Sequence, residues 1–342
     1  NVWYCIMNGH LDISEVARSL QLFNLGLKLQ EEAKLGKNIL EHVRESYSRD
    51  RNDGSNLVVA LGSYDPLSIA HESLFLRGLN LVKEKSLRFN ELSLNELLIV
   101  TSTLHFNKKV DFRKNSAIYD RIHSLEGFAS CYENVGLALF NKPLFVDLAD
   151  AIEQKYYPGI NIYFLVGSDV MEKVIDPLGY ASRGLDSEEI FSKLFKHHFI
   201  VSERKMKTND GEKVVSLSDL LDLYGGVSKY EHKMIHMELQ DSYEVLEIPI
   251  EDVSSTLIRN RRSKRFNTRE LEAVGISDFI DKRGLYLKDD LQYAAFTCAR
   301  ERFAIENRGK PIATYIRQLM NHLEEMNYNK NLQDKELRIY EE

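Results

Sequence analysis

The sequence predicts an α/β fold: a doubly wound, Rossmann-like parallel sheet with helical extensions at both ends. Short, uniformly apolar runs recur through the middle of the chain, and stretches with helical spacing separate them. Such runs are typical of strands buried on both faces of a parallel sheet, whose strands need crossover helices between them. The runs lie at residues 57–61, 97–100, 162–166, 199–201 and 245–248.

The N-terminal part of the chain is predicted to be helical. Apolar residues recur at helical spacing over residues 12–48, with Ser14 placed to cap the first turn. Gly36 predicts a break, and a second helical piece is expected to continue over residues 39–43. A polar stretch then leads to the first strand. Residues 1–55 are therefore assigned to a helical N-terminal extension.

The central domain is expected to span residues 56–287, with helices at 68–84 and 146–156 between its strands. The polar stretch from Met206 to Lys233 is expected to be a loop or an insert. Residues 288–342 are assigned to a C-terminal extension. Its first helix carries acidic residues near its start and arginines near its end, as the helix dipole favours, and a second helix follows.

The composition is that of a globular protein that can bury a core. Of the 342 residues, 43% are hydrophobic and 28% are charged. A net charge of −7 and a pI of about 5.9 argue against a general nucleic-acid binder, which is usually basic. No apolar run reaches the roughly 18 residues of a membrane helix, so no membrane partner is expected, and no secretory signal is recognised at the start.

The cysteines and histidines give no sign of a structural metal site. Cys5, Cys131 and Cys298 are far apart and form no C-x-x-C pair, which disfavours a disulfide framework and fits a reducing compartment. A cytoplasmic location is therefore expected. His232 and His236 stand four residues apart and would suit a metal pair on one helix face, but no third ligand is in view. No metal site is assigned to the protein itself.

The first apolar run leads into a loop that is suited to binding phosphate. Residues 61–71 read L-G-S-Y-D-P-L-S-I-A-H: a strand, a glycine turn, a proline, and a helix that begins near Ser68. A loop that feeds a helix N-terminus presents free backbone N–H groups and the positive end of the helix dipole. His71 is expected in the first turn of that helix, where its ring could donate to a phosphate oxygen.

A second segment, after the last predicted strand, has the makings of another anion cradle. Residues 253–259 read V-S-S-T-L-I-R, which places hydroxyls at a helix start and the guanidinium of Arg259 one turn further on. Five of the seven residues from Arg259 to Arg265 are basic. We interpret this run as a local field for a phosphate ligand and a solvated helix face, in preference to a nucleic-acid-binding or nuclear-import segment.

Together these segments resemble the nucleotidylyltransferase superfamily, and most closely the nicotinate and nicotinamide mononucleotide adenylyltransferases. Residues 62–71 resemble the signature G-x-F-x-P-x-[HT]-x-G-H, and residues 253–259 resemble I-S-S-T-x-I-R. Gly167-Ser168-Asp169, at the end of the middle strand, resembles the G-A-D of these enzymes. The resemblance spans roughly residues 56–287. It implies that the AMP part of ATP is joined to nicotinate or nicotinamide mononucleotide with release of pyrophosphate, in a step of NAD biosynthesis.

The resemblance also implies which residues form the site. The catalytic group is expected to be His71, Ser68 and Arg259. Mg²⁺ is expected to enter with ATP, and Asp169 would bind a ribose or help to locate the metal ion. The residues expected to bind ATP are Gly62, Ser63, Tyr64, His71, Gly167, Asp169, Ser254, Ser255, Thr256 and Arg259; those expected to bind the acceptor are Lys108, Tyr180 and Arg204.

Two positions depart from the first signature. Ser68 stands where the signature has His or Thr, and keeps a hydroxyl; Ala70 stands where it has Gly, and its methyl group is expected to crowd the nucleotide. These departures leave two alternatives open. One is a related enzyme with another acceptor, such as phosphopantetheine, or with CTP as donor. The other is a nucleotide-binding regulatory or scaffold protein that no longer turns its ligand over.

The expected partners are ATP and a mononucleotide, with no role for nucleic acid. The sequence leaves the role of the two extensions open: they could cover the domain, build a homo-oligomer or bind a partner.

Overall fold

The computed structural model describes residues 13–46, 55–88, 95–103, 116–156, 158–208, 211–237 and 250–287. Beyond these ranges it describes ten single positions: 293, 297, 298, 301, 302, 305, 306, 314, 317 and 321.

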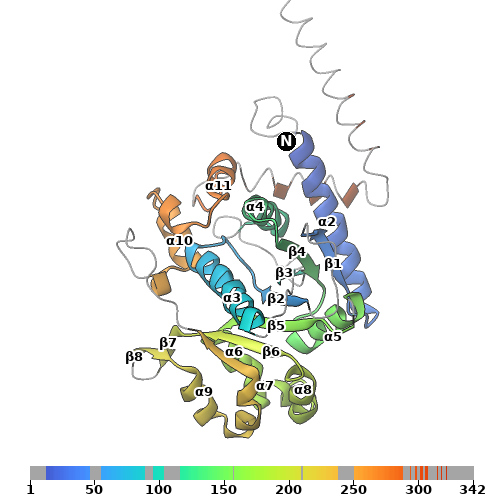
Figure 1. Cartoon of the computed structure of the whole chain (residues 1–342). Helices are drawn as coiled ribbons and strands as arrows, with labels where there is room; N and C mark the ends of the chain where they lie inside the picture. The colour runs from blue at the N-terminus through green and yellow to red at the C-terminus, as the bar shows by residue number, and fades with distance from the viewer. Residues whose placement is uncertain are drawn as a thin grey trace, which may run out of the picture.

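Within these residues, seven strands form one sheet in the order β1-β4-β3-β2-β5-β6-β9 (Figure 1). The six strands from β4 to β9 run parallel to their neighbours, and β1 runs antiparallel to β4 at the edge. From β2 in the centre, the chain builds outward first on one side and then on the other. This is the doubly wound, Rossmann-like α/β arrangement that the apolar runs predict. The strands are β1 Leu40–Arg44, β2 Asn56–Leu61, β3 Asn95–Ser102, β4 Val135–Phe140, β5 Asn161–Gly167, β6 His198–Ser202 and β9 Met234–Met237.

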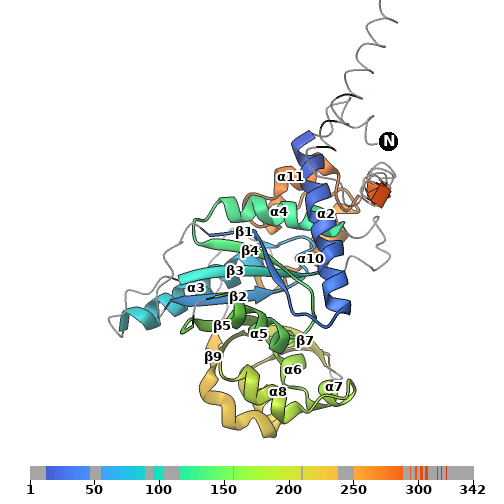
Figure 2. The ribbon, with the colours of Figure 1, turned by 90° about the vertical axis from the view of Figure 1, so that its right-hand side faces the viewer.

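Helices cover both faces of the sheet. Along β2, Leu57 and Val59 face one core cluster, whereas Val58 and Ala60 face the other, so each strand is apolar on both sides. Figure 2 shows α5, α6 and α8 on one side of the sheet and α4 and α11 on the other. The helices involved are α3 Ile69–Arg88, α4 Ile118–Ser130, α5 Phe145–Lys155, α6 Ser168–Ile175, α8 Ser187–Leu194 and α11 Ser277–Arg283.

The polar stretch between β6 and β9 is an insert with secondary structure of its own. It contains a β-hairpin, a short helix and a 3-10 helix, in place of a loop. Further elements within the described residues are α7 Pro177–Ala181, β7 Arg204–Thr208, β8 Gly211–Val215, α9 Leu217–Leu223, η2 Gly225–Lys233, η3 Ile250–Asp252, α10 Ser255–Arg262 and η4 Arg269–Leu271.

The second helical piece predicted near the N-terminus is wrong. Helix α2, Ile13–Lys34, forms as expected, and Gly36 follows it with φ +80°, but residues 40–44 form strand β1. The reason lies outside the segment: without β1, the edge of β4 would be left unpaired. Leu40 pairs with Phe140 and is buried, and α2 packs on α4 through a third apolar cluster.

Two further expectations concern the other edge of the sheet. The run at 245–248 lies outside the described residues. The edge strand of the described part is β9, which is only four residues long. His232 belongs to η2 and His236 to β9, so the two histidines do not share a helix face as the metal-pair interpretation required. His236 instead forms an ion pair with Glu203, at 2.9 Å.

Every described residue beyond 287 is helical, as expected for the C-terminal extension. Tyr293 is buried and belongs to the same core cluster as α3, α4 and α11. In the part of the chain that the structure describes, no helix is long and apolar enough to cross a membrane.

Candidate functional site

The predicted phosphate loop lies at the centre of the sheet. Strand β2 ends at Leu61 and leads through residues 62–68 into α3, and its neighbour β5 ends at Gly167 and leads into α6. These two strands flank the point at which the winding of the chain reverses direction. In open α/β sheets, ligands bind at the carboxyl ends of the strands beside this point.

Tyr64 shapes the loop by folding back over Gly62. A Cβ on Gly62 would lie 2.5 Å from Cζ of Tyr64, so any other residue at this position would displace the ring. Tyr64 itself has φ +44°, a left-handed conformation that is uncommon for a residue with a side chain. Its ring meets the His71 ring edge-on, with the centroids 5.4 Å apart. The Tyr64 ring is therefore buried between Gly62 and His71.

Ser68 orients His71. The Ser68 hydroxyl oxygen lies 2.7 Å from Nδ1 of His71, and the Ser68 backbone N–H donates to the same nitrogen at 3.2 Å. Because a backbone N–H can only donate, Nδ1 accepts, and the ring proton sits on Nε2. The ring N–H of His71 therefore points away from Ser68, at Nε2. Ser68 is 0% exposed, and its hydroxyl contacts the His71 ring inside the protein.

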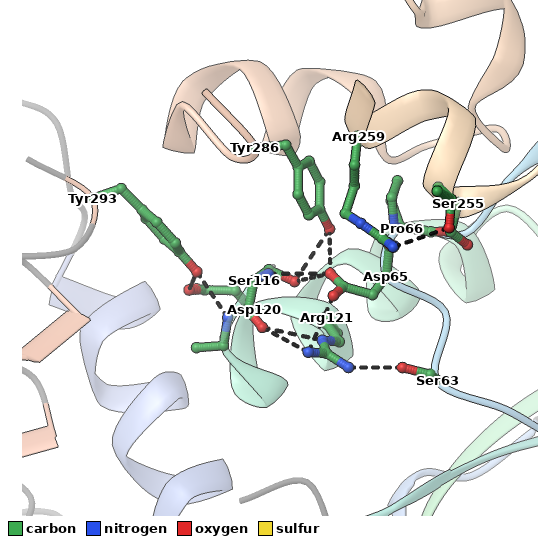
Figure 3. Close-up of polar contacts among 12 residues, drawn as sticks. Ser63, Asp65, Pro66, Ser116, Asp120, Arg121, Ser255, Arg259, Tyr286 and Tyr293 are labelled. Carbon is green, nitrogen blue, oxygen red and sulfur yellow. Dashed lines mark hydrogen bonds and ion pairs between the residues drawn. The ribbon is translucent and has the colours of Figure 1, made fainter. Parts of the chain in front are cut away.

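The start of α10, which is the second predicted anion site, contacts the loop at residues 62–68, which is the first. Ser255 Oγ donates to the carbonyl of Pro66 at 2.7 Å, and Nη1 of Arg259 donates to the carbonyl of Asp65, a residue 194 positions away in the sequence (Figure 3). Nη2 of Arg259 donates to Oγ1 of Thr256 at 3.1 Å. Ser254 caps α10 by accepting from the N–H of Leu257. Two helix N-termini and one guanidinium therefore converge on a single loop.

The methyl group of Ala70 does not crowd a ligand, contrary to our expectation. Ala70 is 1% exposed and belongs to an apolar cluster with Val253 and Ile258. The methyl group thus contributes to the packing of α3 against α10, the helix that carries the second cradle.

Asp169 lies in the first turn of α6, two residues after Gly167, which is the N-cap of that helix. Its Oδ1 is buried and has no hydrogen-bond partner among the described residues. A buried carboxylate oxygen without a donor is costly, which makes it suited to a ligand hydroxyl or to a cation with its water.

Of the three residues expected to bind the acceptor, the structure describes the side chain of Tyr180 alone. Tyr180 is 5% exposed, its hydroxyl donates to the carbonyl of Val174 at 2.9 Å, and its ring packs edge-on against Phe191. Burial raises its pKa to about 12. The role of Tyr180 as a platform for the acceptor ring is therefore wrong, because the ring is committed to the core. Arg204 begins β7, where only the backbone is described, and Lys108 lies outside the described residues.

A buried group around Asp65 was missed by the sequence analysis. The Asp65 carboxylate binds Ser116, Arg121 and Tyr286, from two distant parts of the chain. Asp65 itself precedes Pro66 in the loop and could have been suspected. Nothing in the local sequence marks Ser116 or Arg121, because their partners are distant along the chain.

The basic run after Arg259 is not uniformly solvated. Arg262 is buried and forms ion pairs with Glu272 at 3.3 Å and Asp281 at 2.8 Å. It therefore holds the end of the domain together and contributes no free cation for a phosphate. Among the described residues, no group of three or more His, Cys, Asp or Glu side chains could hold a metal ion.

Comparison with known proteins finds similarity in structure only. No protein-family model and no curated protein matches the sequence. The chain is similar to nicotinic acid mononucleotide adenylyltransferase from Plasmodium falciparum in complexes with APC and with NaAD, each at 17% identity and a TM-score of 0.43, over 68% of this chain and 97% of the other. It is also similar to a candidate nicotinate-nucleotide adenylyltransferase from Vibrio parahaemolyticus, at 14% identity and a TM-score of 0.38, over 68% and 96%. Scores this low do not carry an activity from those proteins to this chain.

Proposed function

We propose that this protein is an adenylyltransferase that joins the AMP part of ATP to nicotinate or nicotinamide mononucleotide and releases pyrophosphate. One observation carries the proposal: Arg259 and Ser255 at the start of α10 bind the backbone of the loop that precedes His71. An anion at this point would meet two helix N-termini, a guanidinium and the Nε2–H of His71 together.

In the proposed reaction, a phosphate oxygen of the mononucleotide attacks the α-phosphorus of ATP. The new P–O bond forms as the bond from the α-phosphorus to the bridging oxygen of the β-phosphate breaks, and pyrophosphate leaves with the electron pair. The attacking phosphate is already an anion, so no strong general base is needed. Catalysis then consists of positioning and of stabilising the negative charge that builds up on the phosphates.

The residues take distinct parts in this step. His71 donates from Nε2 to the reacting phosphates, while Ser68 holds the ring in that tautomer. Arg259, with Ser254, Ser255 and Thr256 at the start of α10, holds the β- and γ-phosphates. Two donors of Arg259 are engaged by the protein, which leaves three of its five N–H groups for phosphate.

Asp169 fits the Mg²⁺ that accompanies ATP. Mg²⁺ usually binds nucleotide phosphates and water with only one or two protein carboxylates, and the unpartnered Oδ1 of Asp169 supplies one such oxygen. The metal would neutralise charge on the phosphates. A ribose hydroxyl is the other ligand that this oxygen suits.

The proposal is tested by measuring pyrophosphate release from ATP and Mg²⁺ with a panel of acceptors: nicotinate mononucleotide, nicotinamide mononucleotide and phosphopantetheine, with CTP replacing ATP in a parallel series. We expect release with ATP and a pyridine mononucleotide, and formation of the corresponding dinucleotide. Pyrophosphate release only with phosphopantetheine, or only with CTP, would show that the protein is an enzyme with a different acceptor or donor from the one proposed. ATP binding without release for any acceptor would refute the enzyme and leave a nucleotide-binding protein.

A further inference from the structure

A buried polar network contacts the phosphate loop, and part of it comes from Tyr286 and Tyr293, which are distant from the loop in the sequence (Figure 3). We call it the Asp65 network. Its members, apart from Asp65, lie outside both sequence motifs. They are Asp65, Ser116, Asp120, Arg121, Tyr286 and Tyr293, all less than 9% exposed.

Asp65 is the centre of the network. Its Oδ1 accepts hydrogen bonds from the backbone N–H of Ser116 at 3.2 Å, the hydroxyl of Ser116 at 2.6 Å and the hydroxyl of Tyr286 at 2.8 Å. Its Oδ2 lies 3.1 Å from Nη2 of Arg121. The backbone carbonyl of the same residue accepts from Arg259. A displacement of Asp65 would therefore displace the hydrogen-bond partner of Arg259.

Arg121 ties the network to the exposed side of the loop. Its Nη1 donates to Oγ of Ser63 at 2.8 Å, while Nε and Nη2 donate to the carbonyl of Ser116 at 3.1 and 2.9 Å. The planar guanidinium thus fixes the start of α4, the Asp65 carboxylate and Ser63 in one geometry. A lysine could not make these contacts together.

Two tyrosine hydroxyls close the network from the C-terminal side. Tyr286, in the turn after α11, donates to Asp65, and burial beside that carboxylate holds the pKa of Tyr286 well above its ordinary value, so its hydroxyl remains a donor. Tyr293 donates to Oδ2 of Asp120 at 2.8 Å and accepts from the N–H of Ala117 at 2.9 Å. It therefore anchors the first turn of α4, from which Arg121 projects.

We propose that Tyr286 and Tyr293 are positioning residues for the nucleotide site: through Asp65 and Arg121, they hold Ser63 and the partner carbonyl of Arg259 in place for the phosphates. The nucleotide part of this inference rests on the proposed function. Its structural part, that two hydroxyls near the C-terminal end of the domain order a loop more than 200 residues earlier, does not.

The test replaces Tyr286 by Phe, which removes one hydroxyl and little volume. The matched control is Tyr180→Phe, which removes the hydroxyl of another buried tyrosine, 5% exposed against 3% for Tyr286. The Tyr180 hydroxyl donates to one backbone carbonyl in the core beside α7, whereas the Tyr286 hydroxyl contacts Asp65 and Ser116. Amide hydrogen exchange over residues 60–72 reports the order of the loop without any ligand. Calorimetry with a non-hydrolysable ATP analogue reports binding, and the thermal midpoint reports stability.

We expect both variants to lose stability, but only Tyr286→Phe to speed exchange over residues 60–72. The same variant is expected to bind the ATP analogue about 3- to 10-fold more weakly. The hydrogen bond from Tyr286 to the Asp65 carboxylate is of the stronger, charged kind, and part of its free energy keeps the loop ordered for the ligand. Tyr293→Phe is expected to speed exchange over residues 116–121 and to weaken binding less, because it acts through Asp120 and Ala117.

Equal exchange over residues 60–72 in Tyr286→Phe and Tyr180→Phe would overturn the inference. If Tyr286→Phe fails to fold, Tyr293→Phe is compared with Tyr180→Phe over residues 60–72, and equal exchange there would overturn the inference. A wild-type protein that binds no ATP, but whose loop loosens in Tyr286→Phe, would refute the proposed function while the positioning of the loop by Tyr286 stands.

Discussion

At the residue scale, the site depends on which nitrogen of His71 carries the proton. The Ser68 backbone N–H and hydroxyl both lie against Nδ1, and this places the proton on Nε2. Ser68 contacts the His71 ring inside the protein and fixes its tautomer.

We predict that His71→Ala folds but loses about 100- to 1000-fold in turnover, the usual effect of removing one preorganised donor to a charge that develops in the transition state. Pyrophosphate release at saturating substrates measures the effect. The control is His198→Ala, because His198 begins β6 and thus lies at the opposite, amino edge of the sheet. Turnover within a few-fold of wild type in a folded His71→Ala protein would rule out the proposed role.

Arg259 makes a second residue-scale prediction. Arg259→Ala should mainly weaken ATP binding, and Arg259→Lys should restore it only in part, because an ammonium cannot bind Asp65, Thr256 and a phosphate in the same fork geometry. Titration calorimetry with the ATP analogue measures both. Lys264→Ala removes a charge beyond the far end of α10 and should change the dissociation constant little. An equal loss of affinity in Lys264→Ala would show that ATP responds to the overall positive charge of this segment and not to a specific contact with Arg259.

At the element scale, the contact between α3 and α10 joins the two motifs. Ala70 contributes a methyl group to this contact, and Ser255 and Arg259 contribute hydrogen bonds to the loop before α3. The two helix N-termini are consequently held at one place by apolar packing on one side and by polar contacts on the other.

This contact changes the expected result of restoring the signature. Ser68→Thr adds a methyl group at a position with no exposure, which typically costs 1–3 kcal/mol, and Ala70→Gly in the first turn of α3 costs about 1 kcal/mol. We therefore predict that the double variant has a lower melting temperature and no higher rate of pyrophosphate release. Ala151→Gly, at a buried position of α5, controls for the glycine. A silent wild type with a working double variant would contradict the prediction and indicate a decayed enzyme.

At the scale of the whole molecule, the N-terminal segment completes the sheet. Helix α2 packs on α4, and β1 covers the edge of β4. Asn141, at the end of β4, fastens the connection between them: its Nδ2 donates to the carbonyls of Leu29 and Lys37, and its Oδ1 accepts from the N–H of Ile39. All three contacts are with the backbone, so this one side chain joins three backbone groups between α2 and β1 to the end of β4.

We predict that Asn141→Ala lowers the free energy of unfolding by about 1–3 kcal/mol, because backbone groups at a buried position lose their partner. Asn134→Ala, which removes a single bond to one carbonyl, should cost less. Denaturant titration measures both. ATP binding should be unchanged, because Asn141 follows β4, which lies two strands from β2, or about 10 Å across the sheet. An unchanged unfolding midpoint, or a loss of ATP affinity, in Asn141→Ala would contradict the conclusion that Asn141 stabilises the N-terminal segment without affecting the ligand site.

The sequence by itself determined the fold class and the two motifs. The buried strands of a parallel sheet are visible because their apolar runs are local, as in β2 and β5. The loop at residues 62–71 and the segment at 253–259 are visible for the same reason: a turn, a cap and a helix start are made by neighbours in the chain.

Only the tertiary structure decided which segments complete the sheet and what faces the site. Residues 40–44 form a strand because β4 offers an unpaired edge, although their local pattern is compatible with a helix. The ring of Tyr180 enters the core, and the methyl group of Ala70 packs on α10. Asp65 meets Tyr286 across 221 positions of sequence. Each of these outcomes depends on a partner that is distant in the chain, and local periodicity carries no information about such a partner.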